Sequence, residues 1–79
     1  APSRVAAERA ERVIAADVLA ESAFAEVHAV CSEEGIRGIV ATPILSSETR
    51  VAGVLTCYLP LAGEPPAELL QAIDSAVSV

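Results

Sequence analysis

Residues 35–59, GIRGIVATPILSSETRVAGVLTCYL, contain two apolar runs separated by a short polar segment. The runs Ile36 to Leu45 and Val51 to Leu59 are apolar at nearly every position, and Ser46 to Arg50 between them has the length of a turn. This pattern predicts two adjacent antiparallel strands in a sheet that is covered on both faces. Because Pro43 lacks the N–H that a ladder needs, a bulge or an irregular register is expected there.

The residues before this hairpin predict two helices and one further strand. Ser3 can cap a short helix that runs to about Glu11, and RVIAAD, from Arg12 to Asp17, is expected to form a strand. Ser22 can cap a second helix that continues through Glu34, where Gly35 supplies the stop. One face of that helix is expected to carry Phe24, Val27, Val30 and Cys31.

The residues after the hairpin predict a linker and a closing helix. The linker runs from Pro60 to Pro66, and its last two prolines suit the first turn of a helix. That helix runs from Ala67 to about Ser78, with one apolar stripe formed by Leu69, Leu70, Ile73 and Val77. The order helix, strand, helix, strand, strand, helix predicts an α+β fold with a small antiparallel sheet and flanking helices.

The composition predicts one small folded domain over residues 1–79. Of the 79 residues, 53% are hydrophobic, but 16 of these are Ala, and the larger aliphatics are ten Val, seven Leu and five Ile. A chain this short buries little more than about 60% of its unfolded surface, so it cannot be divided further. A disordered segment would be poorer in Val, Ile and Leu.

The charge distribution argues against a nucleic-acid partner. Eleven carboxylates face five cations, which gives a net charge of −6, and the cations do not cluster. Nucleic-acid binding needs several Lys or Arg side chains on one face. No apolar stretch approaches the roughly 20 residues that cross a bilayer, and the charged start APSRVAAERAER does not resemble a signal peptide. We therefore expect no membrane partner and a cytoplasmic location.

The usual motifs for nucleotide, phosphate, metal and serine chemistry are missing from the sequence. It has no GxGxxG, P-loop, HExxH, paired CxxC or GxSxG, and no cofactor is expected. Cys31 and Cys57 are expected to be reduced and to act as buried small hydrophobes, although a disulfide between them remains an alternative. His28 and Cys31 lie one helical turn apart, and a protonated imidazole there would favour a reactive thiolate.

Six short segments occur in an order that is typical of one domain family. They are RVIAADV at 12–18, Phe24, GIRG at 35–38, TPI at 42–44, GVL at 53–55 and ELL at 68–70. In this order they resemble the C-terminal half of a GAF domain, a small-molecule-binding regulatory module of signalling proteins. The resemblance implies a non-enzymatic sensor in signal transduction.

The resemblance also implies that part of the GAF pattern is missing. The opening helix and first two strands of the family have no counterpart, which would make this a truncated GAF-like domain. In the family the first strand lies beside the last, so Val51 to Leu59 would form an exposed apolar edge. We therefore expect a homodimer through this strand and the C-terminal helix, or a chain that is a fragment of a larger protein.

By the same resemblance, a ligand pocket would lie between the sheet and the helix at 22–34. Arg37 could meet an anionic group, or instead pair with Glu33 or Glu34, while Thr56 and Tyr58 could offer hydroxyls or simply pack. The candidate lining is Phe24, Val27, His28, Cys31, Arg37, Ile39, Ala41, Thr56 and Tyr58. His28 is also a candidate haem or metal ligand, although a lone histidine in a helix is more often an ordinary partly exposed residue.

An enzymatic alternative rests on His28 and Cys31. A His-x-x-Cys about a dozen residues before a strand proline is similar to free methionine-R-sulfoxide reductases, which are built on the GAF fold. Cys31 lies twelve residues before Pro43. The acidic residues of that enzyme pattern are missing, and Cys57 would have to replace its upstream resolving cysteine.

Overall fold

The computed structural model describes residues 1–47 and 50–78 and forms an α+β fold around a three-stranded antiparallel sheet. The predicted fold class is thus confirmed. Its elements in chain order are α1 (Pro2–Arg9), β1 (Val13–Ala15), two 3₁₀ segments, η1 (Val18–Ala20) and η2 (Ser22–Val27), α2 (His28–Glu34), β2 (Gly38–Leu45), β3 (Val51–Leu59) and α3 (Ala67–Val77).

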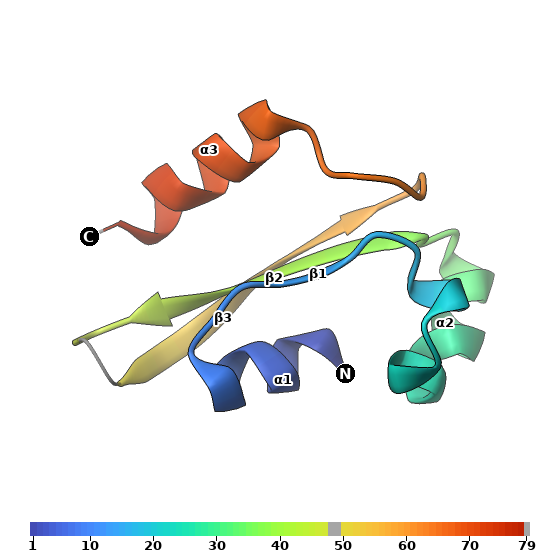
Figure 1. Cartoon of the computed structure of the whole chain (residues 1–79), viewed down its shortest axis with the longest axis horizontal. Coiled ribbons are helices and arrows are strands. Elements are labelled where there is room, and N and C mark those ends of the chain that lie inside the picture. The colour runs from blue at the N-terminus through green and yellow to red at the C-terminus, as the bar shows by residue number, and fades with distance from the viewer. Residues whose placement is uncertain (48–49, 79) are drawn as a thin grey trace.

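The sheet order is β1-β2-β3, so β2 is central and β3 forms one edge. Its two faces are covered by different helices: α1 and α2 lie below the sheet in Figure 1, and α3 lies above it. The prediction of a sheet covered on both faces is therefore correct. We call the side of α1 and α2 the pocket face and the other side the α3 face.

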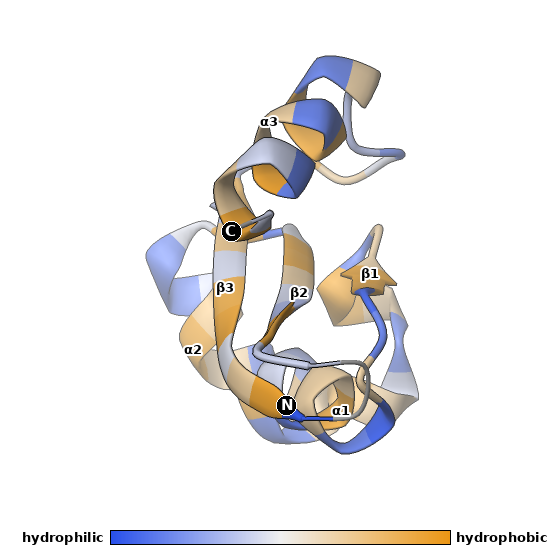
Figure 2. Cartoon of the chain, turned by 90° about the vertical axis from the view of Figure 1, so that its left-hand side faces the viewer, coloured by the Kyte–Doolittle hydropathy of each residue, from blue (hydrophilic) through white to orange (hydrophobic). Residues whose placement is uncertain are grey.

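The register assigns alternate strand residues to the two faces. Ile39 in β2 pairs with Ala15 of β1 and with Tyr58 of β3, and these three side chains lie on the pocket face. Val40, one residue along, lies on the α3 face beside Ile14 and Cys57. The apolar character of β3 is visible along its ribbon (Figure 2), as expected for a strand with neighbours above and below it.

The hydrophobic core is concentrated on the pocket face. Ala15, Val18, Phe24, Cys31 and Ile39 form one buried cluster, which Val5 and Val13 help to enclose. On the α3 face, Ile73 is the buried residue of α3, with Leu69, Leu70 and Val77 half-buried beside it. The predicted stripe on the closing helix therefore packs as expected.

The strand predicted at 12–17 is shorter in the structure, and the charged side chains at both of its ends are held by side-chain partners. The Arg12 Nε–H donates to Thr42 Oγ1 at 3.0 Å, and the same guanidinium pairs with Asp74 of α3. At the other end, the Asp17 carboxylate pairs with Arg37. Only Val13–Ala15 remain in the sheet.

The helix predicted at 22–34 is divided into η2 and α2. Phe24 has non-helical backbone angles, φ −114° and ψ 28°, and this break accompanies burial of its ring in the core. Neither segment has a side-chain cap, so the cap expected from Ser22 is wrong, as is the cap from Ser3 on α1.

Gly35 ends α2 as predicted, in a left-handed conformation with φ 72°. Its N–H donates to Ser32 O at 3.4 Å, and the N–H of Ile36 donates to Cys31 O at 2.8 Å. These two bonds form a Schellman motif, which favours glycine because other residues are strained at positive φ. The motif places Ile36 beside Cys31.

The bulge expected at Pro43 lies further along the hairpin. Pro43 is paired with Val54, and the register shifts between Ile44 and Leu45, opposite Ala52. The predicted turn Ser46 to Arg50 lies partly outside the described residues, and at its described ends the Ser46 N–H donates to Arg50 O at 3.0 Å. Pro65 and Pro66 precede α3 rather than forming its first turn.

Candidate functional site

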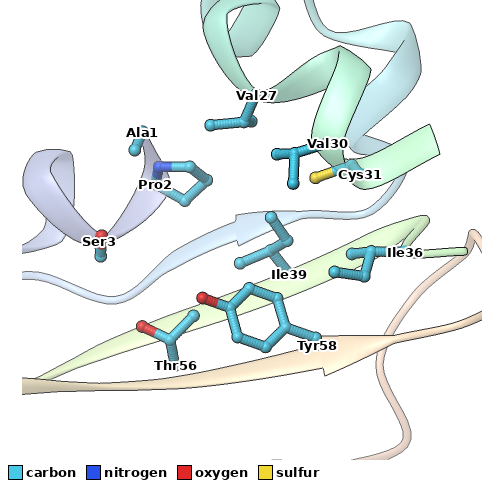
Figure 3. Close-up of a pocket in the computed structure, with 10 residues that line it drawn as sticks. All are labelled: Ala1, Pro2, Ser3, Val27, Val30, Cys31, Ile36, Ile39, Thr56 and Tyr58. Carbon is cyan, nitrogen blue, oxygen red and sulfur yellow. The ribbon is translucent and has the colours of Figure 1, made fainter. Parts of the chain in front are cut away.

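A cavity of about 190 Å³ lies on the pocket face, at the side of the molecule where β3 forms the sheet edge. Its walls come from the start of α1, from α2 and its C-terminal turn, and from β2 and β3 (Figure 3). The lining residues are Ala1, Pro2, Ser3, Val27, Val30, Cys31, Ile36, Ile39, Thr56 and Tyr58.

The strands supply the base of this cavity and two of its hydroxyl groups. Thr56 and Tyr58 are two residues apart in β3, so both project from the pocket face toward α1 and α2 (Figure 3). Ile39 pairs with Tyr58 across the ladder and is almost fully buried. A bound molecule would therefore meet apolar carbon at the base and hydroxyls along one side.

Helix α2 supplies the opposite wall. Cys31 is 3% exposed and belongs to both the core cluster and the cavity lining, whereas Val30 is 51% exposed at the rim. The Schellman motif at Gly35 brings Ile36 to the same wall. Cys31 is a free thiol, so the cavity contains one sulfur atom as well as hydroxyl and aliphatic groups.

None of the side chains that line this cavity carries a charge, and the α-ammonium group of the lining residue Ala1 is already paired with the carboxylate of Glu26. Ionic ligands lose strong hydration when they are buried, and a site without a compensating charge binds them poorly. The volume is also below the roughly 300–1,000 Å³ of a drug-sized site, but exceeds the about 150 Å³ of a dry cavity that holds benzene. The cavity therefore suits an uncharged molecule of about one ring.

The structure brings five of the nine candidate lining residues together. These five are Val27, Cys31, Ile39, Thr56 and Tyr58. Phe24 does not line it, because its ring is buried in the core cluster and reaches a separate surface hollow beside β1. Ala41 is fully buried and also lies outside the cavity lining.

Arg37 also lies outside the cavity lining. Its Nε–H donates to Asp17 Oδ1 at 3.2 Å and its Nη2–H to Asp17 Oδ2 at 2.8 Å. These hydrogen bonds, and the attraction between the charges, lower the pKa of Asp17 and raise that of Arg37. The alternative that Arg37 pairs with Glu33 or Glu34 is therefore wrong. Its guanidinium is already hydrogen-bonded to Asp17 in the absence of any anionic ligand.

His28 contacts the backbone rather than the thiol. Its Nε2 lies 2.9 Å from the carbonyl oxygen of Glu21, which assigns the proton to that nitrogen. The residue is absent from the cavity lining, although it starts the helix that carries Cys31. Within residues 1–47 and 50–78, no group of three His, Cys, Asp or Glu side chains is arranged to hold a metal ion.

Cys57 lies on the opposite face of the sheet from Cys31. It is between Thr56 and Tyr58 in β3, and neighbouring strand residues alternate between faces. Both cysteines are free. The sheet therefore separates the two thiols. The alternative of a disulfide between Cys31 and Cys57 of one copy is wrong.

Five lining residues were not among the sequence candidates: Ala1, Pro2, Ser3, Val30 and Ile36. The first three reach the cavity because α1 crosses beneath β2 and β3. The apolar spacing of the second helix did indicate Val30, and the glycine at position 35 gave a signal for the turn that places Ile36.

Comparison with models of known protein families gives no match, and neither does comparison with curated proteins. None of the helices in the described parts of the chain is long and apolar enough to cross a membrane.

Proposed function

We propose that this chain is a GAF-like, non-enzymatic regulatory module that senses a small molecule in signal transduction in the cytoplasm. The observation that carries the proposal is the cavity on the pocket face, whose lining side chains carry no charge and include the hydroxyl groups of Thr56 and Tyr58. Its ligand is an uncharged compound of about one ring, with a polar group that can hydrogen-bond to one of these hydroxyls. An anionic ligand held by Arg37 is not part of this proposal, because Asp17 already occupies that guanidinium.

The order of the elements supports the GAF-like assignment. Strand β1, the helical segment through α2, the β2–β3 hairpin and α3 follow one another as in the C-terminal half of that family. The edge position of β3 also agrees with that half of the family sheet, in which the family's first strand would lie beside β3. We propose that this edge, together with α3, mediates homodimerisation.

The ligand proposal can be tested with 4-fluorophenol, whose ring and single hydroxyl match the cavity, followed by fluorine NMR. Val27→Phe, which fills the cavity from the end of η2, should abolish the broadening and shift that the wild-type protein produces. Val77→Phe is the matched control, because Val77 is half-buried on the α3 face. Absence of binding to the wild type, or equal binding to both variants, would contradict the proposal. Native mass spectrometry of the purified protein would identify a retained natural ligand.

A thiol-dependent reductase is the second candidate, and the presence of Cys31 in the cavity lining favours it. In such a reaction the Cys31 sulfur attacks the sulfoxide sulfur, and the sulfide leaves as Cys31 becomes a sulfenic acid. A thiol donor in solution then releases water and forms a mixed disulfide, which a second donor thiol reduces. Cys57 of the same copy cannot replace the thiol donor, because it lies on the α3 face of the sheet.

The two candidates are separated by an assay of free methionine sulfoxide with dithiothreitol as the donor. The non-enzymatic module predicts no turnover above the background of the donor alone. Turnover by the wild type that is lost in Cys31→Ser but kept in Cys57→Ser would establish the reductase instead.

A further inference from the structure

A second hollow, of about 400 Å³, lies on the surface where α1, β1 and η2 meet. We call it the β1 hollow. It shares no lining residue with the cavity on the pocket face, so the two are separate features of the molecule. Its apolar wall, against which an aliphatic or aromatic group can pack, is formed by Val5, Val13, Ile14, Ala23 and Phe24.

The β1 hollow also contains three charged side chains. Arg9 is in the last turn of α1, Arg12 directly precedes β1, and Glu21 is the N-cap residue of η2. Ala10, between the two arginines, turns the chain through a left-handed backbone conformation with φ 55°. Residues other than glycine seldom adopt that conformation, because it is sterically unfavourable. This tight corner between α1 and β1 allows both guanidinium groups to line the same hollow.

The three charges differ in whether they already have partners. Arg12 pairs with Asp74 of α3. In the part of the chain that the structure describes, the side chains of Arg9 and Glu21 make no ion pair or hydrogen bond, either with each other or with other residues. Glu21 is half-buried, so its carboxylate has lost part of its hydration without gaining a partner.

One unpaired cation and one unpaired carboxylate favour a zwitterion over an ion of either sign. A purely anionic ligand would meet the Glu21 carboxylate and the net charge of −6 of the chain. A purely cationic ligand would meet both guanidinium groups. A molecule with one carboxylate and one ammonium group can satisfy Arg9 and Glu21 together, through charge-assisted hydrogen bonds.

We propose that the β1 hollow binds a small zwitterion with an apolar body, which is the chemistry of a free amino acid with an aromatic or large aliphatic side chain. Arg9 holds the carboxylate of the ligand, Glu21 holds its ammonium group, and its side chain packs against Val13 and Ile14. The volume of the hollow lies within the roughly 300–1,000 Å³ of small-molecule sites. The site is independent of the cavity and of the function proposed for it.

L-Phenylalanine and two analogues test the chemistry of the ligand. Of the analogues, 3-phenylpropionate lacks the ammonium group and 2-phenylethylamine lacks the carboxylate, while both keep the ring. L-Phenylalanine should bind at least about threefold more tightly than either, a factor typical of one partly exposed ion pair. Glycine, which has both charges but no side chain, should bind at least about tenfold more weakly than L-phenylalanine. Nitrogen–proton correlation NMR measures each affinity, with the amides of Val13, Ile14 and Ala23 as reporters.

Charge variants assign the two polar contacts. Arg9→Gln should weaken the binding of L-phenylalanine and 3-phenylpropionate about threefold or more, and should leave the binding of 2-phenylethylamine no weaker. Glu21→Gln should weaken the binding of L-phenylalanine and 2-phenylethylamine instead. Arg4→Gln is the matched control, because Arg4 is an exposed arginine of α1 outside the hollow. Equal effects of Arg4→Gln and Arg9→Gln would contradict the assignment.

A steric variant tests the location of the site. Ala23→Phe, at an exposed position within the hollow, should abolish the binding of L-phenylalanine, whereas Ala25→Phe, exposed on η2 but outside the lining, should not. Neither variant should change the binding of 4-fluorophenol to the cavity, so failure of one site is distinguishable from failure of the other. The proposal would be overturned by a wild type that does not bind L-phenylalanine up to its solubility limit, by equal affinities for the three phenyl compounds, or by binding that survives in Ala23→Phe.

Discussion

Arg37 and Asp17 form a two-point ion pair, with Nε 3.2 Å from Oδ1 and Nη2 2.8 Å from Oδ2. The pair joins the start of β2 to the end of β1, where the N–H of Val18 also donates to Arg37 O at 2.7 Å. Two parallel hydrogen bonds fix the guanidinium in the plane of the carboxylate. The pair therefore orients the chain as it leaves the sheet toward the helical segment that carries the cavity wall.

We expect this pair to make stability depend on pH in the acid range. The pKa of Asp17 is lowered in the folded protein, chiefly by the hydrogen bonds from Arg37, so its contribution is fully present above the ordinary value near 3.9. The contribution is lost as the pH falls through the lowered pKa that Asp17 has in the folded protein. Urea midpoints should show wild type more stable than Asp17→Asn at pH 7, with the gap shrinking at pH 3 and below.

The control for this experiment is the Arg37→Gln background, which removes the cause of the shift. There, Asp17→Asn should have a smaller effect that depends less on pH. A gap between wild type and Asp17→Asn that is the same at pH 7 and pH 2 would contradict the assignment.

Thr42→Val should destabilise the protein by roughly 1 kcal/mol. Thr42 is 5% exposed, and its hydroxyl accepts the Nε–H of Arg12, which also pairs with Asp74 of α3. Valine keeps the shape but leaves the half-buried guanidinium without that acceptor. Thr56→Val is the matched control, measured by urea unfolding at low protein concentration, and it should stay within about 0.5 kcal/mol of wild type. Equal effects of the two variants would argue against the Arg12 bond.

Two glycines in neighbouring strands should respond differently to alanine. A Cβ at Gly38 would lie 3.3 Å from both Leu59 Cβ and Leu61 O, neither of which is the flexible end of a side chain. A Cβ at Gly53 would meet only Ile44 Cδ1, at 3.9 Å. We expect Gly38→Ala to cost about 1–3 kcal/mol and Gly53→Ala to be neutral or stabilising, as measured by thermal unfolding. The reverse order would contradict the packing described.

Two valines provide a matched test of where the core lies. Val40 in the central strand is fully buried, whereas Val30 at the cavity rim is 51% exposed. Val40→Ala should lower the free energy of unfolding by about 2–3 kcal/mol, and Val30→Ala by less than about 1 kcal/mol. Chemical denaturation of both variants at one low concentration checks this, and similar losses would be inconsistent with a core centred on β2.

The hairpin and the closing helix could be predicted from the sequence because their signals are local. Two apolar runs of strand length have few other arrangements in so short a chain. β3 occupies Val51–Leu59 as expected, whereas β2 begins at Gly38, two residues after the predicted start at Ile36. The apolar stripe on α3 likewise predicted the face that packs on the sheet. The presence of helices on both faces of the sheet follows from the scarcity of polar positions in the strands.

The partners of the charged residues could not be predicted, because they depend on which chain segments meet in space. Arg37 has Glu33 and Glu34 close by in sequence, but its partner is 20 residues away, where β1 leaves the sheet. Arg12 similarly reaches Asp74, 62 residues further along. The contribution of Pro2 and Ser3 to the cavity has the same origin, since it follows from the path of α1 beneath the sheet.

The positions of Cys31 and Cys57 give the protein two natural chemical reporters in separate layers. Alkylation of Cys31 requires the wall between α2 and the sheet to open, whereas alkylation of the half-buried Cys57 requires access on the α3 face. The labelling rate of Cys31 therefore reports on the opening of that wall, and the labelling rate of Cys57 reports on the accessibility of the α3 face. A ligand that occupies the cavity would slow the first rate selectively, so a single mass spectrum could reveal which side of the sheet a compound protects.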